Sequence, residues 1–304
     1  MADIADRVAV IGAGAVGTCV AWNLVYAGRD VTVCVREPID RLVLQVGDGE
    51  PMALPAVSAT SPAQVGCQDW VLVATKAQDT ASAQPWLEAA AGPGTVIVLL
   101  QNGIDHASRL GSLPHGAAVL PALVHINLEP VARGQARQRA GGEIAVPSGE
   151  QGSRLSRLFA GTGITIRLEQ DFRAAAWRKL LGNVAHNPIL TLTGRRADAF
   201  TEPDVLALAA RLISEAAAVA SAEGVVISDQ EVSDIVAGLG ALPGDAGNSM
   251  LFDRLRGRTL ESEFLTGAVV RAGQAAGVPT PLNEAVLTLL RASSRGAPPA
   301  QPGT

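Results

Sequence analysis

Lysine is rare in this chain, and both lysines occur in patterns where a cation that can release a proton would serve binding or proton transfer. Lys and Arg together number 24, yet only Lys76 and Lys179 are lysines. Arginine stays charged in proteins, whereas the compact ammonium group of lysine can release a proton. Lys76 follows the apolar run Trp70–Thr75, and Lys179 opens the pattern Lys-x-x-x-Asn-x-x-x-Asn. We therefore expect both lysines to take part in binding or proton transfer.

The pattern at Lys179 places three polar side chains on one face of a helix. Lys179, Asn183 and Asn187 recur every fourth residue. Apolar Leu180 and Val184 lie beside them, and apolar surroundings lower the pKa of an ammonium group, which suits it to donate a proton. Asparagine is a poor helix former, so two at this spacing indicate a function for the face.

A glycine motif, Gly12-Ala-Gly14-Ala-Val-Gly17, follows the apolar run Val8–Ile11 and precedes a helical stretch that Gly28 ends. Such glycines allow a tight turn, the approach of a pyrophosphate and close packing of helix on strand, while the helix N-terminus attracts the phosphate charge. The residues predicted to bind a dinucleotide are Gly12, Gly14, Ala15, Val16 and Gly17.

The residues after the second predicted strand, Val31–Val35, bear on the choice between NAD and NADP. An acid there would bind the ribose 2′-hydroxyl group of NAD, whereas an arginine would pair with the 2′-phosphate of NADP. Arg36 comes first and Glu37 second. This order favours NADP over NAD, with Arg36 as the phosphate ligand.

Other polar residues lie where loops of an α/β fold converge. Lys76 and the loop Gln101-Asn102-Gly103 each follow a predicted strand, at the sheet edge where open α/β folds bind ligands. Ser249 and Glu261 are suited to an oxygen-rich ligand, although Glu261 is equally an ordinary acid in the first turn of a helix.

The first half alternates short apolar runs with helical stretches, which predicts a doubly wound parallel sheet of the Rossmann type, buried on both faces. The predicted strands are Val8–Ile11, Val31–Val35, Trp70–Thr75, Val96–Leu100 and Ala117–Val124, and the predicted turns are Gly47–Gly49 and Gly141–Gly142.

From about Asp171 strand patterns give way to long helical patterns rich in Ala and Leu. We expect an α/β fold with a Rossmann domain over 1–170, an all-α substrate and catalytic domain over 171–295 and a disordered tail over 296–304. The predicted helices are Asp171–His186, Pro203–Glu223, Asp229–Gly238, Leu260–Ala276 and Pro281–Ser293, the first of them ending before Pro188.

Composition excludes several classes of protein. The net charge of −5 is shared between both halves, which argues against a nucleic-acid surface. The cysteines and histidines show no metal-ligand or disulfide spacing. We find no basic leader at the N-terminus and no apolar stretch near the ~20 residues of a membrane helix. We expect a cytoplasmic protein that binds neither membranes, metals nor nucleic acid.

Five motifs in this order resemble the ketopantoate reductase family, the 2-dehydropantoate 2-reductases, over nearly the whole chain. They are Gly12–Gly17, Thr75–Gln78, Gln101–Gly103, Trp177–Asn187 and Ser249–Glu261. The resemblance implies reduction of a 2-oxo acid to a 2-hydroxy acid by NADPH, with ketopantoate as the first candidate substrate and pantothenate biosynthesis as the pathway.

The resemblance also implies a role for each polar residue. Lys179 would be the general acid, and Glu261 would bind a hydroxyl group or the lysine. Asn183 and Asn187 would hold substrate oxygens and Ser249 the substrate carboxylate, while Lys76 and Asn102 would lie between cofactor and substrate.

Two departures from the family pattern leave the substrate open. The family often carries a further asparagine downstream of Asn187, where this chain has Ala197, and a polar residue before the Ser-Met pair, where Ala246 and Gly247 stand. A reductase of a different 2-oxo acid is therefore one alternative. A homodimer through the helical domain is also left open.

Two other functions compete. A 3-hydroxyacid dehydrogenase also uses Lys-x-x-x-Asn, but it expects a glycine-rich loop where this chain has Pro121–Asn127. A redox sensor would bind NADPH and a partner without turnover, but it has no need of a proton donor such as Lys179.

Overall fold

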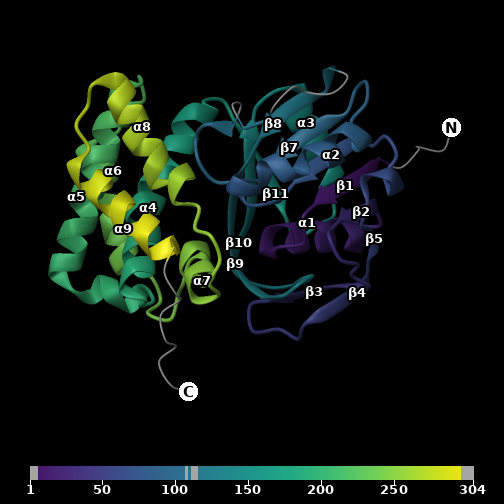
Figure 1. Ribbon diagram of the computed structural model, residues 1–304, viewed down its shortest axis with the longest axis horizontal. Helices are drawn as coiled ribbons and strands as arrows, with labels where there is room; N and C mark the ends of the chain where they lie inside the picture. The colour runs from purple at the N-terminus through teal and green to yellow at the C-terminus, as the bar shows by residue number, and fades with distance from the viewer. Residues whose placement is uncertain (1–5, 107–108, 111–115, 296–304) are drawn as a thin grey trace. The chain divides into compact units, whose positions relative to one another are not determined.

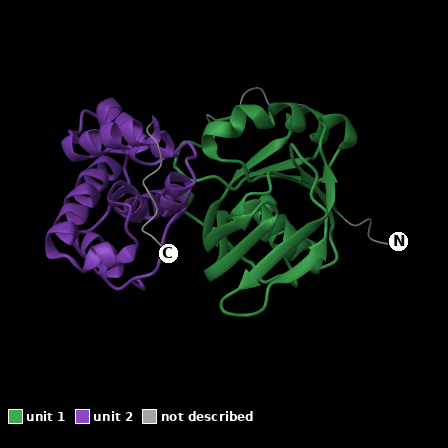
Figure 2. Cartoon of the chain, turned by 60° about the horizontal axis from the view of Figure 1, so that its bottom comes forward, with its two compact units in different colours: residues 1–172 green, residues 173–304 purple. Residues whose placement is uncertain are grey.

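The computed structural model describes residues 6–106, 109–110 and 116–295. The chain divides into two compact units, Met1–Phe172 and Arg173–Thr304 (Figure 2). The predicted domain boundary at Gln170 lies beside this division. The predicted tail, 296–304, lies outside the described residues.

A parallel sheet forms the centre of the first unit, as predicted (Figure 1). From β1 the chain adds strands on one side, β2 and β5, and later on the other, β6, β7 and β8. The direction changes between β1 and β6, and the carboxyl ends of strands at such a point are where open α/β sheets bind ligands. The strands in spatial order are β5 (Val57–Ala59), β2 (Asp30–Cys34), β1 (Arg7–Ile11), β6 (Trp70–Val73), β7 (Val96–Leu99) and β8 (Ala118–Pro121).

Alternate residues of these strands enter two different cores. Val8 and Val10 belong to a buried cluster with apolar side chains of α1 (Ala15–Tyr26). Ala9 and Ile11 belong to a second cluster with side chains of α2 (Thr80–Ala90). Burial on both faces explains why these strands read as continuous apolar runs.

A second sheet, which the sequence analysis did not predict, contributes to the core around α1. Leu42, Leu44 and Ile144 join the cluster that contains Val8 and Val10. The other face of these strands carries polar side chains, so their sequences lack the continuous apolar run from which a strand is predicted. The sheet consists of β11 (Thr165–Glu169), β10 (Gln135–Pro147), β3 (Arg41–Val46) and β4 (Met52–Pro55) in that order, with β9 (Leu123–Ala132) paired to β10.

The two predicted glycine turns have different outcomes. Gly47–Gly49 joins the antiparallel strands β3 and β4, as predicted. Gly141–Gly142 is not a turn, because both glycines lie inside β10, where the register with β9 shifts. A Cβ atom at Gly141 would lie 2.3 Å from the carbonyl oxygen of His125, so the glycine permits close approach of two strands.

The second unit is helical, as expected, but two helix boundaries differ clearly from the prediction and one helix was not predicted. The first helix continues through Pro188, because buried Ile189 and Leu190 pack beyond it and outweigh the lost backbone donor. The helix predicted from Leu260 begins later, and a short helix from Ser249 was missed. The helices are α4 (Phe172–Thr193), α5 (Pro203–Ala222), α6 (Asp229–Gly240), α7 (Ser249–Leu255), α8 (Thr266–Ala276) and α9 (Pro281–Arg295).

Helix α5 corrects the prediction that no apolar stretch approaches the length of a membrane helix. Its 20 residues have a mean hydropathy of 1.6, which is long and apolar enough by length and composition alone. Leu212 and Ile213 are buried in the unit. The Glu215 carboxylate accepts hydrogen bonds from the backbone N–H groups of Leu282 and Asn283, both at 3.0 Å, at the start of α9. One side of α5 therefore packs within the helical unit, and its many alanines raise its mean hydropathy.

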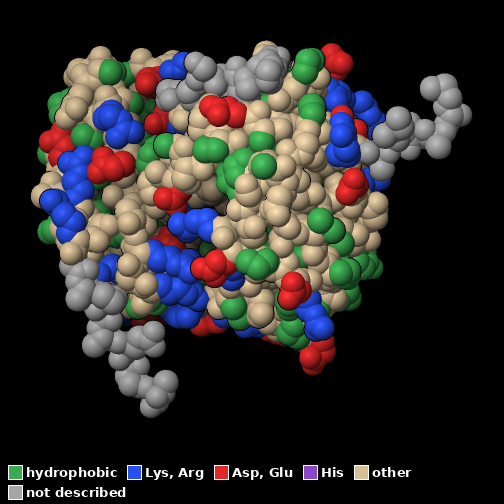
Figure 3. All heavy atoms as spheres, turned by 45° about the vertical axis from the view of Figure 1, so that its right-hand side comes forward, with side chains coloured by type: hydrophobic (Ala, Val, Ile, Leu, Met, Phe, Trp, Pro, Cys, Tyr) green, Lys and Arg blue, Asp and Glu red, His purple; other side chains and the backbone are tan. Residues whose placement is uncertain are grey.

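Arginines in both units pair with acidic side chains, for example Arg137 with Asp48 at 2.7 Å and Arg178 with Glu231 at 2.7 Å. On the face drawn in Figure 3, basic and acidic side chains lie next to one another in small groups. Much of the positive charge of the chain is therefore balanced locally.

Candidate active site

The glycine motif forms the turn between β1 and α1. Gly12 has a φ of 101°, and its N–H group donates to the carbonyl oxygen of Cys34 in β2 at 3.0 Å. A Cβ atom at Gly17 would lie 1.9 Å from the carbonyl oxygen of Gly12. Glycine is required at 12 for the backbone conformation and at 17 for the packing of helix on turn.

Gly14 differs from the other two glycines in this motif. A Cβ atom at Gly14 would meet no atom within 4 Å, and the backbone there, with φ −72° and ψ −174°, suits any residue. Gly14 is the N-cap of α1 and makes no side-chain hydrogen bond to the first turn of the helix. The open backbone and the helix N-terminus fit a pyrophosphate, and the glycine at 14 lets it approach.

Arg36 and Glu37 follow β2, at the same edge of the sheet as the glycine turn. Both side chains are exposed. Glu37 forms an ion pair with Arg133, whereas Arg36 forms none within the described part of the chain. An exposed cation without an ion-pair partner is suited to a phosphate group.

Lys76 and Asn102 follow β6 and β7, and the side chain of Gln101 ties these two loops together. The buried Gln101 amide donates to the carbonyl oxygen of Thr75 at 3.2 Å and to the Thr80 hydroxyl group at 2.8 Å. It therefore fixes the backbone on either side of Lys76 and directly before Asn102. This role of Gln101 was not predicted, although a polar residue directly after an apolar strand is a signal for it.

In the second unit, α4 carries Lys179, Asn183 and Asn187. Lys179 and Asn183 are half-buried and Asn187 is buried. Burial lowers the pKa of Lys179 to about 8, and the negative charge of Glu261 partly opposes this shift. The ammonium group can therefore lose and regain its proton near neutral pH.

Glu261 lies close enough to Lys179 for its charge to act on the lysine, although the two residues are far apart in the sequence. Its side chain is buried, in the segment between α7 and α8. The negative charge of this buried carboxylate favours the protonated form of the lysine.

Ser249 is the first residue of α7, and Asn248 fixes it to α4. The Asn248 side chain accepts a hydrogen bond from the Leu251 N–H group at 2.9 Å, which caps α7, and donates to the carbonyl oxygen of His186 at 3.0 Å. Ser249 is therefore held to the helix that carries Lys179. Asn248 was not among the predicted site residues, although its position before a Ser and a short apolar run suits an N-cap.

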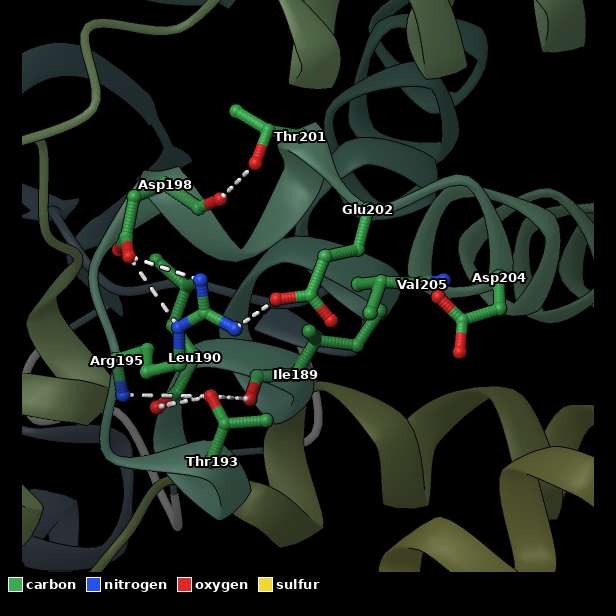
Figure 4. A network of polar contacts seen from close by, with 9 residues as sticks. All are labelled: Ile189, Leu190, Thr193, Arg195, Asp198, Thr201, Glu202, Asp204 and Val205. Atoms are coloured by element: carbon green, nitrogen blue, oxygen red, sulfur yellow. Dashed lines mark hydrogen bonds and ion pairs between the residues drawn. The ribbon is translucent and has the colours of Figure 1, made fainter.

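The segment that follows α4 is fixed by a network of polar contacts around Arg195 (Figure 4). Arg195 pairs with Asp198 at 2.9 Å and also with Glu202. Next to Asp198, the N–H group of Ala197 donates to the carbonyl oxygen of Ala246 at 2.9 Å. The two alanines at which the chain departs from the family pattern are therefore neighbours.

Each unit thus gathers its own set of the predicted residues. The glycine motif, Arg36, Lys76 and Asn102 lie at the carboxyl ends of the parallel strands. The second unit contributes the α4 residues, Ser249 and Glu261. Among residues 6–106, 109–110 and 116–295, no three His, Cys, Asp or Glu side chains are placed to hold a metal ion.

Both units match known proteins. Residues 8–151 match the family model described as Ketopantoate reductase PanE/ApbA, and residues 171–294 match the model of its C-terminal part. A 2-dehydropantoate 2-reductase of Caulobacter vibrioides is 38% identical over 288 residues, which cover 94% of this chain and 99% of that protein. One of Mycobacterium tuberculosis H37Rv is 36% identical over 294 residues, covering 96% of this chain and 99% of that protein.

A solved structure of a dimeric ketopantoate reductase from Staphylococcus aureus has the same fold. Its TM-score is 0.84 at 25% identity, and the match covers 95% of this chain and 99% of that one. The predicted combination of a Rossmann sheet and a helical C-terminal part is therefore confirmed. Membership implies a nicotinamide dinucleotide cofactor, for which the glycine turn is suited. The chain belongs to the ketopantoate reductase family of oxidoreductases.

Proposed function

We propose that this protein reduces ketopantoate to pantoate with NADPH and that Lys179 is the general acid. The observation that carries the proposal is the half-buried Lys179, whose pKa is lowered to about 8, on a helix face with Asn183 and Asn187. The curated relatives from Caulobacter and Mycobacterium are named 2-dehydropantoate 2-reductases, which supports the choice of substrate.

The first unit binds the cofactor and the second the substrate in this proposal, with the boundary near Gln170. Arg36 binds the 2′-phosphate of NADP, and Lys76 and Asn102 contact the cofactor, Asn102 also reaching the substrate. The pyrophosphate is held by the backbone of Gly12, Gly14, Ala15, Val16 and Gly17.

The cofactor, when bound, supplies the hydride that reduces the carbonyl carbon of the substrate. Lys179 donates a proton to the carbonyl oxygen, and its positive charge stabilises negative charge developing there. Glu261 keeps Lys179 protonated through its own negative charge. Asn183 and Asn187 hold substrate oxygens by hydrogen bonds, and Ser249 binds the carboxylate.

Reduction of a different 2-oxo acid is the second candidate. Ala197 and Ala246 adjoin one another, and neither side chain can form a hydrogen bond with a substrate hydroxyl group. A site without such partners accepts substrates that lack the hydroxyl group.

The test is to follow NADPH absorbance with ketopantoate and with a panel of other 2-oxo acids. Fastest turnover with ketopantoate would support the first candidate, and turnover only with another acid would support the second. NADPH binding without turnover of any acid would contradict an enzymatic role and favour a sensor.

We further propose that the protein forms a homodimer through the helical unit, and that it acts in the cytoplasm in pantothenate biosynthesis. The structurally similar S. aureus enzyme is described as dimeric, which supports the first point. The second follows from the proposed reaction.

Replacing Arg36 by alanine is expected to raise the Kd of NADPH by about 10–100-fold, because a charge-assisted contact to the 2′-phosphate is lost. The Kd of NADH, which has no such phosphate, should change little. Fluorescence titration of both cofactors measures this difference. Equal weakening of both would mean that Arg36 does not bind the 2′-phosphate.

The rate of reduction is expected to fall as pH rises through about 8, because the proton donor is the charged form of Lys179. In the Glu261→Gln variant, loss of the negative charge that raises the pKa of Lys179 should move this fall to lower pH. Profiles of kcat/KM against pH test both points. The Lys179→Arg variant, whose cation does not titrate in this range, provides the control. A fall that stays in place in this control would assign it to another group.

A further inference from the structure

The two-residue turn between β9 and β10, Arg133-Gly134, is held against the dinucleotide loop. The Gly134 N–H group donates to the carbonyl oxygen of Ala13 at 3.4 Å, and the Gly134 carbonyl oxygen accepts from the Val43 N–H group at 2.8 Å. Gly134 has a φ of 68°, and a Cβ atom there would lie 2.9 Å from the carbonyl oxygen of Arg41. Main-chain contacts therefore fix the place of this turn beside the glycine motif.

From this fixed turn, Arg133 forms an ion pair with Glu37. Glu37 is adjacent to Arg36, the residue proposed to bind the 2′-phosphate. Within the described residues Arg36 has no ion pair of its own. The acid beside Arg36 is thus neutralised by a cation from elsewhere in the unit, and Arg36 is left available.

The charges at this site bear on the choice of cofactor. Arg36 and Glu37 alone have a net charge of zero, whereas Arg133 brings the group to +1. A carboxylate without its cation would repel a 2′-phosphate, could pair with Arg36, and is also the usual acceptor for the ribose 2′-hydroxyl group of NAD. Neutralising Glu37 therefore favours NADP and disfavours NAD.

We propose that Arg133 is a positioning residue for cofactor selectivity, which pairs with Glu37 and so leaves Arg36 to the 2′-phosphate of NADP. This inference rests on the proposed use of NADPH. Arg133 acts through Glu37 and does not need to touch the cofactor. The pair is exposed, with 48% and 71% of the two side chains accessible, so the expected effect is modest.

The Arg133→Ala variant should raise the Kd of NADPH by about fivefold, the size expected for an exposed ion pair. The Kd of NADH should stay the same or fall, because Glu37 can then accept a hydrogen bond from the ribose. Fluorescence titration with NADPH and NADH gives the ratio of the two Kd values, which general damage to the fold would not change. An unchanged ratio would overturn the inference.

Arg137→Ala is the matched control. Arg137 lies on the same hairpin and pairs with the exposed Asp48, where the chain turns between β3 and β4, although its own side chain is half-buried. Its loss should leave the ratio of Kd values unchanged. A ratio that changes as much as in Arg133→Ala would assign the effect to hairpin stability and overturn the inference.

A double variant, Arg133→Ala with Glu37→Gln, separates action through Glu37 from direct contact with the phosphate. If Arg133 acts through Glu37, removing the acid should restore the Kd of NADPH to that of Glu37→Gln alone. A Kd that stays as high as in Arg133→Ala would mean direct contact and overturn the inference. The Arg36→Ala variant tests NADP use separately, so the two proposals fail in distinguishable ways.

Discussion

Replacing Lys179 by alanine is expected to lower kcat by ~10²–10⁴-fold and to leave the Kd of NADPH almost unchanged. The side chain is half-buried on α4, in the unit without the glycine motif, and burial lowers its pKa to about 8. In the proposed mechanism its removal deletes both the proton donor and the positive charge that stabilises the developing alkoxide. Steady-state kinetics with NADPH and the best 2-oxo acid, together with cofactor titration, measure the two quantities.

Arg178→Ala is the control for this experiment, since Arg178 is the adjacent residue of α4 and pairs with Glu231 at 2.7 Å. It removes a positive charge from the same helix and should leave kcat near the wild-type value. A wild-type kcat in Lys179→Ala would remove Lys179 from the mechanism. Equal losses in both variants would assign the effect to the helix.

A second large effect is expected from adding one methyl group to the glycine turn. In Gly17→Ala, the new Cβ atom would lie 1.9 Å from the carbonyl oxygen of Gly12, so turn and helix must separate. We expect the Kd of the cofactor to rise by about 100-fold or more, and the Tm to fall by about 5 °C or more. Cofactor titration and thermal unfolding followed by circular dichroism measure the two effects.

Gly14→Ala provides the comparison, because a Cβ atom at Gly14 meets nothing within 4 Å and the backbone there suits alanine. Its Tm should stay within about 2 °C of the wild type, while the Kd of the cofactor should rise because the second glycine of the motif admits the pyrophosphate. Cofactor binding of wild-type strength in Gly14→Ala would contradict a dinucleotide site at this turn.

How far the fold was predictable depended on whether a strand is buried on one face or two. Val8–Ile11 and Val96–Leu99 are buried throughout and stand out as apolar runs. In β10, Gln135, Arg137 and Arg139 alternate with buried Ala136 and Gln138, of which Gln138 is polar, and two glycines interrupt the pattern. The sequence of the second sheet therefore gives no strong strand signal, and its paired glycines predict a turn.

The candidate site was predictable where its residues are close in sequence. The spacing of Lys179, Asn183 and Asn187 predicts that they share one helix face, and α4 contains all three residues. The influence of Glu261 on Lys179 and the pairing of Glu37 with Arg133 join residues far apart in the chain. Such contacts depend on tertiary structure. Recognising Arg133 in particular required the second sheet, because only the β9–β10 turn brings it to Glu37.

The hydrogen bonds of Asn248 have a consequence for how the protein responds to heat. A helix of seven residues, the length of α7, is not stable alone in water. It persists because Asn248 caps it and joins it to α4. We expect opening of these two bonds to let α7 fray and to displace Ser249 while the sheet of the other unit stays folded. If Ser249 binds the substrate as proposed, we expect affinity for a 2-oxo acid to be lost through local unfolding, at temperatures below the main melting transition.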